Sequence, residues 1–452
     1  MRYVSGLPRK VCIVAVQGMV RKGNPANYTS PKNLIKEMLI NALREARLGV
    51  HHIDGLIAVP SLAESHFMEA HYQATTLGFF RRSGLHSIGV SEDKPNIRCR
   101  TIDTGGAGPI TALLEGARMI KNEFCEVVCI LAGDSVGSLD SSEFLKKADS
   151  TCQSPDPLPS PVIPHGYGRI TRYQLDQGKV TRDQLRLAVV LDSIHASMHP
   201  GALYKGPPLT LDDVRASPTI VDLSKHEKLS STISATNVPT KADIETTKSE
   251  EYDDSSSGEI SLLECARRAD GAAAIILASN RFLARQNMLD SENRYPTIIG
   301  SGEASGPLYP PEEITEAMFS CEDACSFAYE EAQLGPEDID FFGLYDCFPV
   351  CLVRAIEACG LSKNGGQYLE DSYEKYLENG TMDHFPINTH GGLLCYGAPW
   401  EVPAAFNIME AVAQLRGNPL GRKVENCRRA LVYGNGGIFS ASSVAIIGNG
   451  KY

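Results

Sequence analysis

The sequence predicts an α/β protein built from two duplicated halves, with a loop domain inserted after the first. Three observations support this fold class. A fifteen-residue pattern occurs twice, each copy is followed by the same order of glycine-rich loop, helix and strand, and the region between the halves is poor in long periodic segments. Two halves with the same strand and helix order imply two similar α/β layers stacked about a pseudo-twofold axis.

The repeated pattern reads ALREARLGVHHIDGL at residues 42–56 and AYEEAQLGPEDIDFF at residues 328–342. Each copy has the features of an amphipathic helix end, a glycine stop, a short turn and a buried strand. Seven identities in fifteen positions make chance similarity the weaker explanation. At a constant offset of 286 residues the identical pairs are Ala42/Ala328, Glu45/Glu331, Ala46/Ala332, Leu48/Leu334, Gly49/Gly335, Ile53/Ile339 and Asp54/Asp340.

The segments after the two copies agree in kind. The first copy is followed by DTGGAGP, a helical stretch and an apolar strand, at residues 103–109, 110–121 and 127–132. The second copy is followed by NTHGG, a helical stretch and an apolar strand, at residues 388–392, 403–415 and 430–433. We therefore expect each glycine-rich loop to precede a helix that packs beside the strand after it.

These boundaries divide the chain into three parts. The N-terminal half covers residues 1–133 and is completed by about 262–292, the loop domain covers 134–261, and the C-terminal half covers 293–452. Within the loop domain, residues 223–258 are rich in Ser, Thr, Lys and Glu and almost free of aromatic residues, which predicts a low-complexity surface insertion. A helix is expected after Thr181, with an apolar face that includes Leu185 and Leu187.

Composition excludes several classes of protein. The net charge of −12 argues against a nucleic-acid partner, and no apolar run approaches the roughly 20 residues that a membrane span needs. Three of the cysteine pairs are spaced i, i+4, but no CxxC pair or histidine cluster accompanies them, which favours buried thiols in a reducing compartment over a metal site. These pairs are Cys125/Cys129, Cys321/Cys325 and Cys347/Cys351.

The N-terminal residues resemble a targeting signal in composition. Seven basic residues precede the first acidic residue, Glu37, and an acid-free basic start is typical of a mitochondrial transit peptide. Residues 10–16 read as a core strand, so such a presequence would be very short. The interpretation is a mitochondrial location, with a cytoplasmic location as the alternative.

Five segments, in this order along the chain, resemble the thiolase superfamily, and within it the sterol-carrier-protein-type thiolases and their thiolase-like relatives. The resemblance implies a layered αβαβα fold, a homodimer, and a coenzyme A thioester bound largely by the loop domain. It also implies Claisen condensation or thiolytic cleavage in lipid metabolism. The segments are LLECARRADGAAAIILAS at 262–279, LYDCF at 344–348, INTHGGLLCYGAPW at 387–400, AVAQLRG at 411–417 and ALVYGNGG at 430–437.

This sequence departs from the family pattern at two catalytic positions. The nucleophilic cysteine of the family falls within residues 105–108, which read Gly-Gly-Ala-Gly, and the family's Gly-His-Pro loop reads Gly397-Ala398-Pro399. The family's His-Asp-Cys-Phe loop reads Tyr345-Asp346-Cys347-Phe348, so the acid/base cysteine is present. Without a thiolate nucleophile no acyl-enzyme forms by the usual route, and conventional thiolase activity is not expected.

Backbone groups remain available for catalysis. Gly106 and Ala107 are expected at a helix N-terminus, where free N–H groups and the helix dipole favour negative charge. Gly436 and Gly437 offer a second flexible approach of the backbone. These positions are candidates for an oxyanion hole, and the alternative is that the glycines only permit tight turns and close packing.

Four side chains are further candidates. Cys347 is a candidate proton donor to an α-carbanion, or else a small buried hydrophobe. Tyr345 is a candidate hydrogen-bond donor to a thioester oxygen, or else a tyrosine with a satisfied hydroxyl in a half-buried wall. Asn388 and His390 lie in the loop expected to face the site, where the alternative is loop stabilisation. Asp346 is expected to cap the helix that follows it.

Three functions fit these residues. The first is enolate chemistry on a short acyl-CoA without an acyl-enzyme, such as malonyl-CoA decarboxylation. The second is retro-aldol cleavage of a 3-hydroxyacyl-CoA, because some thiolase-like aldolases resemble this chain in lacking the nucleophile and using a tyrosine. The third is a non-catalytic acyl-CoA-binding protein. In each, the coenzyme A thioester is substrate or ligand, and no other cofactor and no metal is expected. In the loop domain only scattered residues, such as His165 and Tyr167, are candidates for contacts with the adenine.

Overall fold

The computed structural model describes residues 9–80, 97–151, 158–223, 258–289 and 295–450. Among these residues, nine strands follow one another in the order β3-β2-β4-β7-β1-β8-β11-β10-β9, and a separate two-stranded sheet joins β5 and β6. Strands β1 and β8 pair only at Cys12 and Thr297, so the nine strands form two half-sheets that meet at one edge. The expected insertion at 223–258 lies almost wholly outside the described residues.

The N-terminal half contributes the first five strands of this order and the helices around them. Its elements are β1 (Val11–Arg21), α1 (Pro31–Ala46), β2 (Gly55–Ala58), α2 (Glu69–Thr76), β3 (Arg98–Thr101), α3 (Gly108–Lys121), β4 (Val127–Asp134), β7 (Asp270–Ser279) and α9 (Asn280–Arg285).

The C-terminal half contributes the other four strands and the helices around them. Its elements are β8 (Thr297–Ser305), α10 (Cys321–Ala332), β9 (Phe341–Gly343), α11 (Pro349–Ala358), α12 (Gly365–Asn379), α13 (Pro403–Arg416), β10 (Arg429–Gly436) and β11 (Ala441–Gly448). A short π-helix, η8 (Gly392–Tyr396), lies between α12 and α13.

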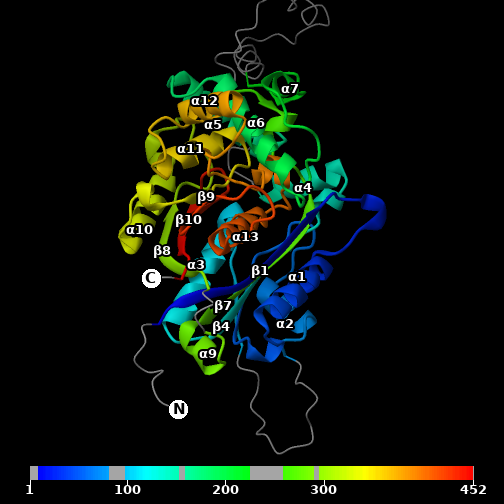
Figure 1. Ribbon diagram of the computed structural model, residues 1–452. Helices are drawn as coiled ribbons and strands as arrows, with labels where there is room; N and C mark the ends of the chain where they lie inside the picture. The colour runs from blue at the N-terminus through cyan, green and yellow to red at the C-terminus, as the bar shows by residue number, and fades with distance from the viewer. Residues whose placement is uncertain (1–8, 81–96, 152–157, 224–257, 290–294, 451–452) are drawn as a thin grey trace, which may run out of the picture.

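The loop domain is mainly helical. In Figure 1 its helices α5, α6 and α7 gather with α11 and α12 at one end of the molecule. Helix α6 begins after Thr181, as the sequence predicts, because the Thr181 side chain accepts a hydrogen bond from the backbone N–H of Gln184, and the Gln184 side chain accepts one from the backbone N–H of Thr181. The elements are α4 (Ser141–Thr151), α5 (Val162–Asp176), α6 (Arg182–Met198), α7 (Leu211–Arg215), β5 (Thr219–Val221) and β6 (Ile260–Ser261).

The two halves have the same strand topology, which confirms the duplication. In the first, β2 is parallel to β4, and β4 and β1 are both antiparallel to β7. In the second, β9 is parallel to β10, and β10 and β8 are both antiparallel to β11. Strand β8 begins 286 residues after β1, which is the offset of the sequence repeat.

Corresponding residues of the repeat have the same local roles in both halves. Helices α1 and α10 end at left-handed residues, Arg47 with φ 53° and Gln333 with φ 54°. The Asp54 carboxylate accepts hydrogen bonds from the two backbone N–H groups at the start of β4. Asp340 accepts the corresponding two at the start of β10. The repeated aspartate therefore ties one strand of each half to the next.

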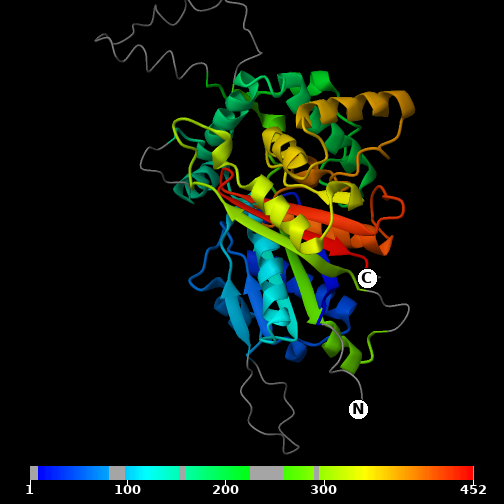
Figure 2. The same ribbon diagram turned by 90° about the vertical axis from the view of Figure 1, so that its left-hand side faces the viewer.

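Helices α3 and α13 form the central layer. They pack against each other, and α3 contacts strands of both half-sheets. Helix α1 covers the outer face of the first half-sheet and α10 that of the second, which gives the layered αβαβα order (Figures 1 and 2). Helix α3 is buried along nearly its whole length, as expected for a helix with sheets on both sides.

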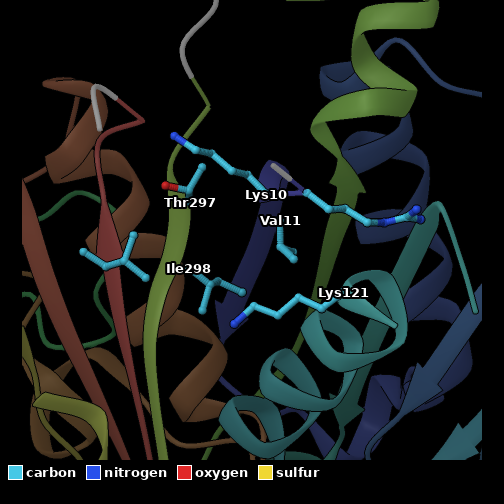
Figure 3. Close-up of a pocket in the computed structure, with 7 residues that line it drawn as sticks. Lys10, Val11, Lys121, Thr297 and Ile298 are labelled. Carbon is cyan, nitrogen blue, oxygen red and sulfur yellow. The ribbon is translucent and has the colours of Figure 1, made fainter. Parts of the chain in front are cut away.

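The starts of β1 and β8 lie beside a small pocket (Figure 3). Val11 and Ile298 form its apolar wall, and the side chains of Arg9, Lys10 and Lys121 surround it. Arg9 and Lys121 already form ion pairs with glutamates, so two of the three cations are neutralised. In the part of the chain that the structure describes, no helix is long and apolar enough to cross a bilayer.

Candidate functional site

Two glycine-rich loops lie in backbone contact where the halves meet. The 3-10 turn η3 (Gly105–Ala107) leads into α3, and the end of β10 leads into Gly437. A Cβ atom on Gly436 would lie 1.8 Å from the Thr104 carbonyl oxygen, and one on Gly105, where φ is +59°, would lie 2.9 Å from the Gly437 nitrogen. Such separations exclude a side chain, so this approach requires glycine.

Tyr345 fills the space beside Gly106. A Cβ atom on Gly106 would lie 2.1 Å from the Tyr345 hydroxyl oxygen and 2.5 Å from the Asn435 carbonyl oxygen. Tyr345 is 5 % exposed. The absence of a cysteine at position 106 and the presence of Tyr345 are therefore linked. The phenol of Tyr345 occupies the volume in which a nucleophilic side chain at position 106 would begin. The sequence identifies both residues but does not show that they touch.

The loop that carries Tyr345 is held by Asn388 and Asp346. The Asn388 amide donates to the Leu344 carbonyl at 2.9 Å and to the Asp346 carboxylate at 3.1 Å, and it accepts from the Leu344 N–H at 2.8 Å. Its amide is thus occupied by the fold, and Asn388 braces the loop. Asp346 accepts from the backbone N–H groups of Leu393 and Leu394, so it caps η8, whereas the sequence suggested the following helix, α11.

Cys347 lies half-buried at the start of α11. Its sulfur is 3.5 Å from that of Cys351. Beside this pair, the Tyr167 hydroxyl donates to the Gly437 carbonyl at 2.6 Å and accepts from the Asn435 amide at 2.9 Å. Tyr167 comes from α5 of the loop domain and is 1 % exposed, so it supports the glycine loop and does not serve as an open platform for adenine.

His390 is a buried, neutral ring. It is 1 % exposed, it packs edge-on against Tyr396 with ring centroids 4.9 Å apart, and its Nδ1 has no hydrogen-bond partner among the described residues. Burial, together with the charge of His199, lowers the pKa of His390 to about 3. A group with that pKa is a poor acid or base at neutral pH, so this environment fits packing better than proton transfer.

Glu401 is a site residue that the sequence reasoning missed. Its Oε2 would lie 3.6 Å from a Cβ atom on Gly108, in the first turn of α3. That oxygen is buried and has no hydrogen-bond partner within the described ranges, although the residue as a whole is half-buried. The signal that could have found it is an acidic residue directly after the apolar Gly397–Trp400 loop.

Burial and neighbouring charges raise the pKa values of both Tyr345 and Glu401. Burial, and then the charges of Cys347 and Glu401, raise the pKa of Tyr345, so its phenol stays protonated and can donate a hydrogen bond. Burial, and then the charges of Asp103 and Asp134, raise the pKa of Glu401. The arrangement places a phenol beside Gly106 and a carboxyl group beside Gly108, at the N-terminus of one helix.

Comparison with known proteins extends the sequence resemblance. The family "Thiolase C-terminal domain-like" matches residues 310–449. The chain is 26 % identical over 274 residues to the benzoylsuccinyl-CoA thiolase subunit BbsB of Thauera aromatica, which covers 60 % of this chain and 58 % of that protein. It is 30 % identical over 182 residues to human (Homo sapiens) sterol carrier protein 2, which covers 39 % of this chain and 32 % of that protein. The matches therefore span less than two thirds of these relatives.

The fold extends the likeness to nearly the whole chain. A solved structure named "Ltp2-ChsH2(DUF35) aldolase" superposes with a TM-score of 0.70 over 98 % of both chains, at 20 % sequence identity. The sheet topology, the family match in the C-terminal region and the similarity to these relatives all indicate a thiolase-like protein. The C-terminal region of this chain matches the thiolase C-terminal domain-like family, and the chain as a whole has the thiolase fold and is similar to thiolases and to sterol carrier protein 2.

Proposed function

We propose that this protein acts on acyl-CoA thioesters through an enolate, without an acyl-enzyme, and that its reaction is the retro-aldol cleavage of a 3-hydroxyacyl-CoA. One observation carries the proposal: the Tyr345 hydroxyl occupies the place where a nucleophile at position 106 would begin. A covalent acyl group has no attachment point there. A hydrogen-bond donor beside a helix N-terminus can instead polarise a thioester carbonyl.

Charge favours retro-aldol cleavage over malonyl-CoA decarboxylation. Glu401 lies beside the first turn of α3, and the charges that act on it are those of Asp103 and Asp134. Such a group of carboxylates repels the β-carboxylate of a malonyl thioester. A 3-hydroxyacyl thioester is uncharged at that position, and its cleavage needs a base for the hydroxyl proton, which a carboxylate can supply.

The other site residues have distinct roles in this reaction. The backbone N–H groups of Gly106 and Ala107, together with the Tyr345 hydroxyl, stabilise the enolate oxygen. Cys347, half-buried beside Tyr345, returns a proton to the α-carbon. Removal of one donor from an oxyanion hole lowers kcat by about 10²–10³-fold in acyl-transfer enzymes, so Tyr345→Phe should have an effect of that size.

The test is a screen of 3-hydroxyacyl-CoA esters for release of a carbonyl compound and a shortened acyl-CoA, with malonyl-CoA assayed in parallel. We expect cleavage by the wild-type protein that is lost in Tyr345→Phe, and intact-mass spectra that show no acyl adduct. Turnover of malonyl-CoA that Tyr345→Phe only weakens would instead support decarboxylation. Binding of acetyl-CoA by calorimetry without any turnover would support the non-catalytic alternative.

The family likeness also leads us to propose a homodimer, which no contact within the single chain tests. Size-exclusion chromatography with light scattering at several protein concentrations measures the oligomeric state directly. A mass near 98 kDa, twice that of the 49.0 kDa chain, is expected, and a mass near that of one chain would overturn the proposal.

A further inference from the structure

The loop between η8 and α13 holds Glu401 in an unusual backbone setting. Trp400, directly before it, has φ +50°, and Gly397 has φ +132°. A bulky residue in the left-handed region costs about 1–3 kcal/mol and persists only where the surrounding structure enforces it. Pro399 and Pro403 further restrict the chain on either side of Glu401. The position of this carboxyl group is therefore imposed by the loop.

One oxygen of Glu401 is buried without a partner in the described part of the chain. The Trp400 indole N–H lowers the pKa of Glu401, but burial, which raises that pKa, has the larger effect. Oε2 is buried and unpartnered among the residues that the structure describes, and it lies beside Gly108. A buried carboxylate oxygen without a partner is costly, and a catalytic role is one of the explanations for such an exception.

The groups that face Glu401 come from three elements. Asp103 precedes η3, Asp134 ends β4, and Tyr345 follows β9. Asp134 is itself held by backbone N–H groups of Ala63 and Ser135, so its place is fixed by the fold. Burial and the charges of Asp103 and Asp134 both favour the neutral carboxyl group, so they raise the pKa of Glu401 above its ordinary value.

We propose that Glu401 is the general base that removes the proton from the 3-hydroxyl group of the substrate, an inference that rests on the proposed retro-aldol reaction. As the C2–C3 bond breaks, the O–H electron pair forms the new carbonyl bond and the proton passes to Glu401. The C2–C3 electron pair becomes the enolate, which the Tyr345 hydroxyl and the backbone N–H groups hold. Cys347 then protonates C2. Solvent restores the proton on Cys347 and removes the one on Glu401.

The direct test compares Glu401→Gln with Glu425→Gln, a matched change at an exposed carboxylate that pairs with Lys423. General-base catalysis contributes about 10²–10⁴-fold, so Glu401→Gln should lower kcat/KM for the 3-hydroxyacyl-CoA by that factor and abolish the acidic limb of its pH profile. Glu425→Gln should leave both unchanged. Equal kcat/KM and an intact acidic limb in Glu401→Gln would overturn the inference.

Two milder variants should move the acidic limb in opposite directions. Trp400→Phe removes the N–H donor that stabilises the carboxylate, so the limb should shift to higher pH. Asp103→Asn removes a like charge from an exposed position, so the limb should shift to lower pH. A purely structural Glu401, serving only as an anionic partner for the α3 N-terminus, predicts altered thermal stability but no such paired shifts.

Deuterium exchange at C2 of the acyl-CoA product tests the proposed function separately from the role of Glu401. Enolisation of acetyl-CoA in D2O needs the enolate-binding groups and Cys347 but no base at the 3-hydroxyl position. We expect Glu401→Gln to keep the wild-type rate of deuterium incorporation at C2 while it loses cleavage. If the wild-type protein neither cleaves nor exchanges, the proposed function fails; if it does both and Glu401→Gln cleaves equally well, only the role of Glu401 fails.

Discussion

The two halves share a scaffold but not a chemistry. At positions 286 residues apart, Asp54 and Asp340 hold equivalent strands in the same way. The loops at the site differ, since the first half presents only backbone at residues 105–108. The second half supplies the phenol, the thiol and the carboxyl group of the proposed reaction, on Tyr345, Cys347 and Glu401. The duplication therefore sets where the strand ends meet, and the chemistry depends on which loop carries side chains.

Neither half forms the site alone. A Cβ atom on Gly434, in β10 of the second half, would lie 2.9 Å from the Cα atom of Ala107 in the first. The first half thus supplies the helix N-terminus, and the second supplies the strand and the loops that surround it. This contact explains why the first loop is limited to small residues, because the space that larger side chains would need is taken up by the other half.

The contact between the halves should be most sensitive at Gly106. In Gly106→Ala the Cβ atom meets both the Tyr345 hydroxyl and the Asn435 carbonyl, and overpacking of this kind costs about 1–3 kcal/mol, with more expected where one neighbour is backbone. Urea unfolding measures the loss. Gly178→Ala is the control, because Gly178 has φ +63° but nothing within 4 Å, so it reports left-handed strain without crowding. Equal losses at both sites would contradict the crowding argument.

The repeated aspartates should matter equally in the two halves. Asp54→Ala and Asp340→Ala each leave two strand N–H groups without their charged acceptor. Hydrogen bonds to charged groups contribute about 1.5–3 kcal/mol, so each variant should lose about that much in free energy of unfolding. A difference of more than about 1 kcal/mol between the two would show that the halves are not equivalent scaffolds.

Much of the scaffold could be predicted because its signals are local. Glycine stops, alternating apolar runs and the identity of Asp54 with Asp340 all act within a few residues, so the sequence pattern located β2, α3, β4, α13 and β10. Thr181 likewise marked the start of α6 through its own capping bonds. These features need no knowledge of which distant segments meet.

The site depends on contacts between distant segments, and a single sequence does not contain them. Tyr345 and Gly106 are separated by more than half of the chain, and only folding shows that one fills the space of the other. Asn388 and His390 were expected to face the site because their loop does, yet the amide of Asn388 bonds within the loop and His390 is buried against Tyr396. Glu401 was missed because its significance comes from Gly108 and Asp103, not from its neighbours in sequence.

The halves should also differ in their response to acid. The pKa of His390 in the native state is about 3, against about 6.5 in the unfolded chain, so the unfolded state binds more protons below pH 6.5. The contribution of this residue to stability is therefore full above pH 6.5 and falls as the pH drops toward 3, by about 2 kcal/mol at pH 5. Urea unfolding of the wild-type protein and of His390→Asn, each at pH 7 and pH 5, measures this pH-dependent contribution of His390 to the free energy of unfolding.

His52 in the first half provides the comparison for this acid response. Burial also lowers its pKa, but the residue is only half-buried, so the pH-dependent loss should be smaller than that of His390. His52→Asn should therefore change the difference between pH 7 and pH 5 less than His390→Asn does. Similar changes in the two variants would mean that the buried environment of His390 does not set its protonation.

The smallest effect concerns two of the ion pairs that join the halves, Lys121–Glu331 and Arg416–Glu45. Each of the repeated glutamates forms an ion pair with the last residue of the other half's central helix. Glu331 pairs with Lys121 of α3 at 3.0 Å, and Glu45 pairs with Arg416 of α13 at 2.5 Å. Exposed pairs contribute about 0–1 kcal/mol, so Glu331→Gln should change the free energy of unfolding by about 0.5 kcal/mol or less. Glu45→Gln should cost more, because Arg416 is less exposed and also donates to the Val14 carbonyl at 2.8 Å.

Repeating both measurements in 1 M salt should reduce the effect at Glu331 more than that at Glu45. The opposite order would mean that the arginine is held by the strand carbonyl alone, and that only one of the two symmetric pairs joins the halves.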